Sequence, residues 1–223
     1  YRNEKNNIIK ILKMKKIFLK VPGFKEFYFF VKEKIIYSLE KKKWNKLKKQ
    51  SKIKLDLGSN KRGTNGFVTI DYMSGDIRHN LFNPLPLENS TVDEIYTSHT
   101  LEHFKFENIL FIIKECNRVL KPDGKLKICV PNSRFYIESY IKRENFIKRK
   151  NWYAPAVTET GSHIDQLNYI AYLNGQHKFM FDEQNLTSMI KMCGFKEVSL
   201  RNFEEDVDLQ ERDYESIYAL GVK

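Results

Sequence analysis

The residues with the clearest potential for chemistry lie near position 60, where an apolar run is followed by a glycine-rich loop. The run ends in Asp56, the loop contains Gly58, Gly63 and Gly66, and a second apolar run ends in Asp71. Glycines let a ligand lie against bare backbone, and a carboxylate at the end of the second strand can accept hydrogen bonds from a ribose diol. The segment therefore predicts a site for a nucleotide-like cofactor.

A second group of reactive side chains is the run His99-Thr-Leu-Glu-His103, which matches the His-x-x-Glu-His pattern of inverted zinc proteases. In those enzymes the two histidines lie one turn apart on a helix. Here residues 92–97 have the pattern of a strand, so the first histidine would end a strand. We therefore expect no metal site from this motif. His103 is left with two interpretations, a polar contact at a pocket rim or a functional residue.

The elements that must position these residues follow from the apolar pattern after Ser51. Strand and helix patterns alternate there: after the strands ending at Asp56 and Asp71 come strands at 76–81 and 92–97, a helix at 106–120 and a strand at 125–130. Such alternation predicts a mostly parallel sheet covered by helices. Only residues 58–66 separate the first two strands, fewer than the dozen or so that a parallel crossover normally takes. The first helix is therefore expected to be reduced to about a turn.

The end of the chain breaks this alternation. Asp182 can cap a helix that Gly194 ends, and two strand patterns follow, at 196–203 and 214–222, with no helix between them. Two such strands must pair antiparallel or lie apart. We therefore predict an α/β fold, a Rossmann-like three-layer sandwich with a mostly parallel sheet, an antiparallel last strand and an N-terminal helical extension.

The net charge of +11 belongs to that extension and not to the globular part. Residues 1–50 hold 16 Lys+Arg and 4 Asp+Glu, a net of +12, and residues 51–223 hold 23 and 24, a net of −1. Apolar residues recur at helical spacing from Phe24 to Leu39. We interpret 1–50 as a basic amphipathic extension whose second helix packs on the domain, with peripheral contact to an anionic membrane as the alternative. No nucleic-acid partner is expected, because the main domain lacks interleaved basic and aromatic residues.

Length and cysteine usage limit the remaining classes. A chain of 223 residues can bury one full core plus an appendage, so we expect one domain, 51–223, after the extension. The three cysteines, Cys116, Cys129 and Cys193, lie in apolar patterns without paired spacing, as in a reduced protein. No apolar run approaches the roughly 18 residues that span a bilayer, and no signal-peptide layout is present. We expect a cytoplasmic protein, at the inner face of the membrane if the extension binds there.

Four motifs in order resemble those of a known family. They are Asp56-Leu-Gly-Ser59 after the first strand, Asp71 after the second, the run from Val92 to His103, and Val119-Leu-Lys-Pro-Asp-Gly124 before a strand. Together they resemble class I S-adenosylmethionine-dependent methyltransferases, in particular the branch with the type 11 methyltransferase domain. The resemblance covers residues 52–130 in motif detail and the rest of the domain in layout.

The resemblance implies S-adenosylmethionine as the cofactor and assigns parts of it to positions in this chain. The backbone from Asp56 to Asn60 would hold the methionine part, and Asp71 would hold the ribose. Asn80 and Leu81 would contact the adenine, and Ser98 and His99 would border the sulfonium. The implied cofactor-binding residues are Asp56, Gly58, Ser59, Asn60, Asp71, Tyr72, Asn80, Leu81, Ser98 and His99. Two departures are Gly58-Ser-Asn60 in place of Gly-x-Gly, and Asn80 in place of the usual acid.

Acceptor binding is expected in the insertion 134–181, which follows the fifth strand. Its aromatic and rarer polar residues are Tyr136, Tyr140, Trp152, Tyr153, His163, Asp165 and His177. Methyl transfer often needs one base to take a proton. The candidates by residue type are His177, His163 and Asp165, with His103 at the pocket rim. For each of them a structural hydrogen bond is the alternative, and a base is not obligatory because the methyl is already electrophilic.

We therefore expect a methyltransferase that acts on a small polar acceptor. Its preferred acceptor class, by resemblance, is a nucleotide-linked sugar or a surface-glycan intermediate. Two other classes stay open. An NAD-dependent oxidoreductase would share the sheet, although its fingerprint is Gly-x-Gly-x-x-Gly and the spacing here is Gly-x4-Gly-x2-Gly. A non-catalytic binding protein of the same fold is the other alternative, because the first glycine motif is incomplete.

Overall fold

The computed structural model describes residues 24–59, 63–144 and 160–223. The chain divides into two compact units, Tyr1–Lys42 and Lys43–Lys223. Helix α3 (Phe24–Leu47) begins in the first unit and ends in the second, so the helix expected over the apolar stripe is present. No helix among the described residues is long and apolar enough to cross a bilayer. The functional boundary at residue 50 stays a prediction.

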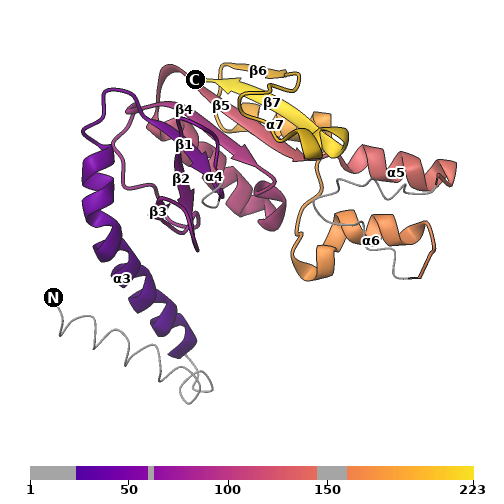
Figure 1. Ribbon diagram of the computed structural model, residues 1–223, viewed down its shortest axis with the longest axis horizontal. Helices are drawn as coiled ribbons and strands as arrows, with labels where there is room; N and C mark the ends of the chain where they lie inside the picture. Colours follow the sequence, from indigo (N-terminus) through magenta and orange to yellow (C-terminus); the bar gives the residue numbers. More distant parts are fainter. Residues whose placement is uncertain (1–23, 60–62, 145–159) are drawn as a thin grey trace. The chain divides into compact units, whose positions relative to one another are not determined.

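The second unit is built on one seven-stranded sheet with the order β3-β2-β1-β4-β5-β7-β6 (Figure 1). Its strands are β1 (Lys54–Leu57), β2 (Val68–Asp71), β3 (Ile77–Arg78), β4 (Val92–Ser98), β5 (Leu120–Pro131), β6 (Glu197–Leu200) and β7 (Ser216–Val222). The pairs from β3 to β5 are parallel, and β7 runs antiparallel to both β5 and β6. The predicted α/β fold with an antiparallel last strand is confirmed.

The helices after the first unit differ in length and place. They are α4 (Phe106–Val119), α5 (Ser133–Lys142), α6 (Ile164–Tyr172) and α7 (Glu183–Met192), with short 3₁₀ turns at Leu101–His103, Leu173–Gly175 and Gln210–Glu215. Asp182 caps α7 as predicted: its carboxylate accepts from the Asn185 N–H, and the Asn185 side chain accepts from the Asp182 N–H. The short connection between β1 and β2 predicted a helix of about one turn. The described residues of this connection, 58–59 and 63–67, contain no helix, and residues 60–62 lie outside the described residues.

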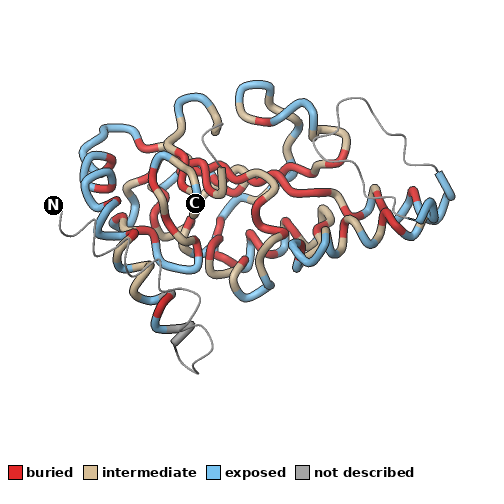
Figure 2. Tube along the Cα trace, turned by 60° about the horizontal axis from the view of Figure 1, so that its bottom comes forward, coloured by how far each residue is buried: buried red, intermediate tan, exposed pale blue. Residues whose placement is uncertain are grey.

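One face of the sheet carries the main hydrophobic core. Alternate residues of the strands, such as Leu55, Ile95 and Ile128, are fully buried there against the apolar stripes of α4 and α7. The last turn of α3 adds Trp44 and Leu47 to the same cluster. Figure 2 shows the buried stretches of the chain in red. This packing fixes the positions of the strands, and therefore of the residues at their carboxyl ends.

The opposite face of the sheet has a smaller apolar part among the described residues 43–223. Its apolar part is a small cluster of Tyr96, Cys129 and Tyr218, against which Phe67, Phe203 and Val207 pack. The rest of this face is held by a row of ion pairs. The Lys54 ammonium lies 2.6 Å from Glu94, Glu94 lies 3.1 Å from Lys127, and Lys127 lies 2.6 Å from Glu204. We call this row the charge ladder.

Two connections gather at the carboxyl edge of the parallel strands. Because β7 is antiparallel to β5, with Ser216 opposite Pro131, the segment between β6 and β7 returns to this edge. On the other side, α5 follows β5 directly and packs against α6 (Figure 1). Open α/β sheets bind ligands outside the carboxyl ends of their strands. The two connections therefore stand on either side of the expected site.

Candidate active site

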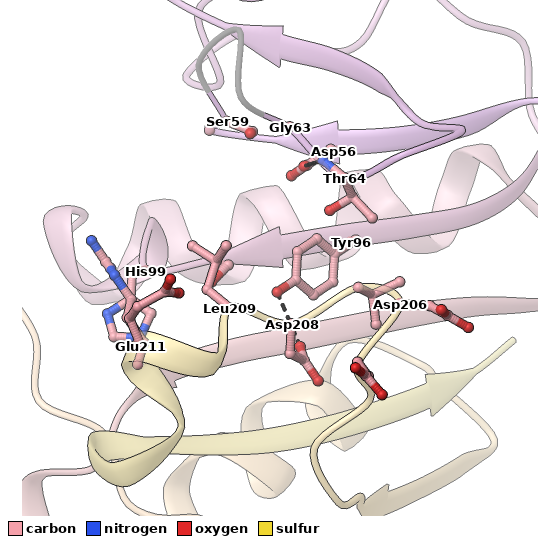
Figure 3. Close-up of a pocket in the computed structure, with 15 residues that line it drawn as sticks. Asp56, Ser59, Gly63, Thr64, Tyr96, His99, Asp206, Asp208, Leu209 and Glu211 are labelled. Atoms are coloured by element: carbon pink, nitrogen blue, oxygen red, sulfur yellow. Dashed lines mark hydrogen bonds between the residues drawn. The ribbon is translucent and has the colours of Figure 1, made fainter. Parts of the chain in front are cut away.

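A cavity of about 530 Å³ lies at the carboxyl ends of β1 and β4 (Figure 3). One wall is the loop after β1, with Asp56 and Gly58 at its start, and the end of β4 supplies Ser98 and His99. The opposite wall is the β6–β7 connection. We call this space the first cavity. It brings together five of the residues predicted to hold the cofactor, which are Asp56, Gly58, Ser59, Ser98 and His99.

Asp56 gives this cavity a buried carboxylate with an unsatisfied oxygen. The residue is 2% exposed, its Oδ2 accepts from the Thr64 N–H at 2.9 Å, and its Oδ1 has no hydrogen-bond partner among the described residues. Burial raises the pKa of this carboxyl, and the hydrogen bonds from Thr64 offset part of that rise. A buried acceptor without a donor is costly. A ligand that brings a cationic or N–H group to this point would remove the cost.

Gly58 fixes the course of the loop after β1. Its φ is +78°, and its N–H donates to the Ile70 carbonyl at 2.8 Å, which ties the loop to β2. A Cβ at this position would overlap the Thr100 side chain. Glycine is therefore required both by the left-handed backbone and by the close packing of Thr100.

The wall formed by the β6–β7 connection was missed by the sequence analysis. Asp208 fixes it: its carboxylate accepts from the Tyr96 hydroxyl at 3.0 Å and from the Arg201 guanidinium at 2.8 Å. Figure 3 shows the Tyr96 ring rising from β4 to meet this carboxylate. The only sequence signal was the acidic run Glu204-Glu-Asp206, which carries no motif.

The first cavity is strongly acidic. Its lining includes one guanidinium, that of Arg212, and a set of carboxylates consisting of Asp56, Glu205, Asp206, Asp208 and Glu211. S-adenosylmethionine carries a sulfonium and an ammonium, so this lining matches its positive charges. The pyrophosphate of a dinucleotide would instead face like charge, which costs binding energy.

A second cavity, of about 230 Å³, adjoins the first. His99 and Arg212 line both cavities. The remaining lining comes from the turn after β4, from α6 and the loop behind it, and from the start of β7; it includes Glu102, His103, Tyr169, Gln176, His177 and Glu215. Two of the three predicted catalytic histidines, His103 and His177, are therefore brought together here.

His99 is held firmly at the junction. Its φ is +46°, its side chain is 6% exposed, and its Nε2 lies 2.8 Å from the Ser216 hydroxyl. That hydroxyl donates to the Arg212 carbonyl at 2.7 Å, so it accepts from Nε2–H of the histidine. Burial lowers the pKa of His99 well below its usual value, assisted by the nearby Arg212 charge. His99 is thus neutral, with Nδ1 turned towards Glu102 at 3.7 Å.

Glu102, His103 and His177 form a compact group in the second cavity. The two imidazole rings meet edge to face with centroids 5.1 Å apart, and His103 Nε2 lies 3.9 Å from Glu102 Oε1. Burial lowers the pKa of both histidines and raises the pKa of Glu102 to about 8. At neutral pH this group is therefore two neutral imidazoles beside a carboxyl that resists ionisation.

The other predicted cofactor residues line neither cavity among the described residues. The Asp71 Oδ1 accepts from the N–H groups of Met73 and Ser74 at 2.7 and 2.9 Å, which closes the turn after β2 next to Gly58. Tyr72 lies in that turn. Asn80 accepts from the Phe82 N–H, and Leu81 packs in the main core.

Two further predictions fall outside the cavities. Asn60 and the insertion residues Trp152 and Tyr153 lie outside the described residues. His163 precedes α6 and lines neither cavity. Asp165, a candidate base, is buried and accepts from the N–H groups of Thr160 and Gly161, so the structure gives it a turn-closing contact.

The comparisons with known proteins agree with this geometry. Residues 49–128 match the family model described as a methyltransferase domain, a range that runs from the start of β1 into β5. Residues 49–128 therefore match a methyltransferase domain of the type 11 branch, over less than half of the chain. On this match the protein is a methyltransferase that uses S-adenosylmethionine.

The solved structures to which the chain is similar include one archaeal and one bacterial methyltransferase. A SAM-dependent methyltransferase from Archaeoglobus fulgidus is 13% identical, with a TM-score of 0.49, over 88% of this chain and 99% of that one. Another from Aquifex aeolicus is 14% identical, with a TM-score of 0.44, over 85% of this chain and 97% of that one. No curated protein matches the sequence.

Proposed function

We propose that this methyltransferase transfers the methyl group to a hydroxyl of a small, polar acceptor bound in the second cavity. The observation that carries this proposal is the adjoining pair of cavities, joined where His99 and Arg212 line both. An acidic cavity suits the cationic donor, and the smaller cavity beside it is rich in groups that bind hydroxyls. Methyl transfer needs donor and acceptor in line, and two adjoining spaces provide this arrangement.

The residues of the first cavity fit the cofactor. When bound, S-adenosylmethionine supplies a methyl group made electrophilic by its sulfonium. The unpartnered Asp56 Oδ1 would accept from its ammonium, the loop backbone at Gly58, which lines the cavity, would hold its methionine part, and Asp71, at the adjacent strand end, would accept from its ribose diol. His99 would stand at the sulfonium end, because it borders both cavities.

In the reaction the methyl carbon leaves sulfur and bonds to the acceptor oxygen, and the hydroxyl proton leaves to a base or to water. His103 and His177 are predicted catalytic residues that line the acceptor space. Either can take that proton, since burial keeps both neutral. General bases contribute about 10²- to 10⁴-fold to rate, so loss of either histidine would slow the reaction without stopping it.

A sugar is the acceptor class that we favour, either nucleotide-linked or part of a surface-glycan intermediate. The second cavity carries carboxyl, imidazole, amide and guanidinium groups in a small volume, which matches a ligand with many hydroxyls. The basic segment 1–50, with its net charge of +12, would hold the enzyme at an anionic membrane surface, which is compatible with a surface-glycan intermediate as acceptor.

The test is a transfer assay with isotopically labelled methyl donor. Nucleotide sugars and free sugars are compared with phenols and with amines of similar size, and the product is identified by mass spectrometry. We expect a methyl ether on a sugar hydroxyl. Transfer to amines or phenols, with none to sugars, would refute the acceptor class and leave the enzyme class unaffected.

Cofactor choice is tested separately by thermal denaturation. S-adenosylhomocysteine at 100 times its dissociation constant should stabilise the protein by about 2.7 kcal/mol, and NAD should have no effect. A shift with NAD alone would contradict the assignment of the first cavity.

A further inference from the structure

The group of Glu102, His103 and His177 has a geometry that the methyltransferase reaction does not by itself require. One carboxylate oxygen and one nitrogen of each imidazole lie within 4.8 Å of one another. The three residues come from two distant parts of the chain: the 3₁₀ turn after β4 supplies two, and the loop after α6 supplies the third. The sequence motif paired His99 with His103, whereas the structure pairs His103 with His177.

Backbone carbonyls orient both imidazoles. His103 Nδ1 lies 3.2 Å from the Gln176 carbonyl, and His177 Nδ1 lies 2.7 Å from the Ile170 carbonyl. A carbonyl can only accept, so in each ring Nδ1 carries the hydrogen, and Nε2 carries the lone pair. Metal-binding histidines commonly donate their second N–H to a carbonyl or carboxylate in this way. Both rings are therefore fixed in the tautomer that a metal ion needs.

The carboxylate adds an independent observation. Glu102 is 3% exposed, and its Oε2 is buried without a hydrogen-bond partner among the described residues. A buried carboxyl with an unsatisfied oxygen and two neutral lone-pair nitrogens beside it is an expensive arrangement. A cation bound between them would satisfy all three groups at once.

The candidate ligand atoms, which lie within 4.8 Å of one another, are farther apart than the ligand atoms around a bound ion. Zinc binds nitrogen and carboxylate oxygen at about 2.0–2.2 Å, so tetrahedral ligand atoms lie about 3.4 Å apart. The Glu102–His103 pair at 3.9 Å is within small side-chain rotations of this value. The His103 side chain is 37% exposed, which gives an ion access from solvent. Two imidazoles and one carboxylate form a ligand set typical of zinc and of other first-row divalent ions.

We propose that Glu102, His103 and His177 bind a divalent transition-metal ion, with zinc as the probe, and that the ion keeps a coordination position open towards the second cavity. Binding of the ion stands on these three residues alone. Its role rests on the proposed function: in the loaded protein the Nε2 lone pairs of His103 and His177 would be bound to the ion and could not take the proton. The open position would hold the acceptor hydroxyl and lower its pKa, so that its proton would leave to water.

The first experiment measures the ion directly. The full chain is stripped with a chelator, and zinc is titrated back by calorimetry, with Co²⁺ used as a spectroscopic substitute. We expect one equivalent of the ion to bind and to raise the thermal stability of the protein. The bound Co²⁺ should give the visible absorption spectrum of an ion with a low coordination number. No uptake of zinc or Co²⁺ by the folded protein would overturn the proposal.

Variants then assign the ligands. We expect zinc binding to weaken at least 10-fold in each of three single variants, His103→Ala, His177→Ala and Glu102→Gln. The double variant that combines His103→Ala and His177→Ala should lose the Co²⁺ spectrum completely. His163→Ala serves as the matched control for zinc binding. His163 belongs to the same insertion as His177, but it lines neither cavity. Equal zinc binding in Glu102→Gln and in the unaltered chain would also overturn the proposal. His103 is partly exposed, so its variant keeps the test valid if a buried variant fails to fold.

The two proposals fail in different ways. If sugars are methylated equally well by the chelated protein and by the zinc-loaded protein, and zinc binds, the ion exists but its role in acceptor binding is refuted. If zinc binds and no sugar is methylated, the acceptor class is refuted while the site stands. S-adenosylhomocysteine binding, which is assigned to the first cavity and Asp71 and to none of these three residues, is expected to be unchanged by these variants and reports that the domain is folded.

Discussion

The two cavities of this enzyme differ in size, charge and origin. The first, of about 530 Å³, is lined by five carboxylates and one guanidinium, whereas the second, of about 230 Å³, is lined by three histidines, two carboxyls and the same guanidinium. One wall of the first cavity comes from the carboxyl ends of β1 and β4, which are neighbours in the sheet. The second combines a turn, a helix insertion and the last strand.

This difference teaches how one sheet edge can separate two substrates. Carboxylates attract a sulfonium donor, and buried neutral imidazoles accept an uncharged, hydroxyl-bearing molecule or a metal ion. His99, held by Ser216 between the two spaces, marks the point where the methyl group would pass. Variants that damage one cavity and spare the other test whether the separation is real.

The largest effect is expected from Gly58→Ala. The left-handed backbone costs an L-residue about 1–2 kcal/mol, and overlap with Thr100 should add about 1–3 kcal/mol. Binding of S-adenosylhomocysteine should be lost, while Co²⁺ binding in the second cavity persists. The control is Gly66→Ala, at φ +79° with nothing within 4 Å of its added Cβ, which should lose only the backbone part. Equal unfolding free energies for both variants would contradict the overlap at Gly58.

Next in size is Asp71→Asn. The amide oxygen can still accept from Met73 and Ser74, so the turn is kept and only the charge is lost. We expect the affinity for S-adenosylhomocysteine to fall by about 1–3 kcal/mol, through loss of charge-assisted bonds. Calorimetric titration measures it. An unchanged affinity would place the ribose elsewhere, since Asp71 lines neither cavity among the described residues.

A smaller effect is expected at the junction, from Ser216→Ala. Removing the hydroxyl leaves Nε2–H of His99 without its acceptor, at a cost of about 0.5–1.5 kcal/mol. We expect kcat to fall about 3- to 10-fold, with the dissociation constant of the cofactor unchanged. A change in cofactor affinity with constant kcat would assign His99 to the first cavity alone.

The smallest effect is a pH dependence at Asp56. Burial raises its pKa above the ordinary 3.8, so the folded state binds the proton more tightly than the unfolded state does. Stability is therefore lost as pH rises from about 4 through the folded-state pKa, by at most about 1.4 kcal/mol per pH unit in that window. Asp56→Asn lacks this loss. The difference in unfolding free energy between the two proteins, measured by urea titration from pH 4 to 7, should move in favour of the variant as pH rises.

The fold and the first wall of the first cavity were predictable because their signals are local. An apolar run, a glycine and an acid are neighbours in sequence, so the pattern of residue types was enough to place Asp56, Gly58 and His99 at strand ends. The same holds for the Asp182 cap. Parallel strands then bring their carboxyl ends to one edge, and no long-range information is needed.

The rest of the site depends on contacts between distant residues. No local pattern shows that Asp208 meets Tyr96, or that His177 lies against His103, because loops far apart in sequence supply these partners. Residue type alone made His163, Asp165 and His177 equal candidates for the general base. In the structure, Asp165 closes a turn by accepting from the Thr160 N–H. The resemblance predicted that Leu81 contacts the adenine. In the structure, Leu81 packs in the main hydrophobic core, a contact that the local sequence does not indicate.

The charge ladder from Lys54 to Glu204 has a consequence for the response to salt. The Lys54 and Glu204 side chains at its two ends are 28% and 41% exposed, whereas Glu94 and Lys127 between them are each 14% exposed. The links at the two ends therefore weaken most as ionic strength rises. Concentrated salt should therefore loosen this side of the molecule first, whereas the apolar side behind α4 and α7 should tighten under the same treatment.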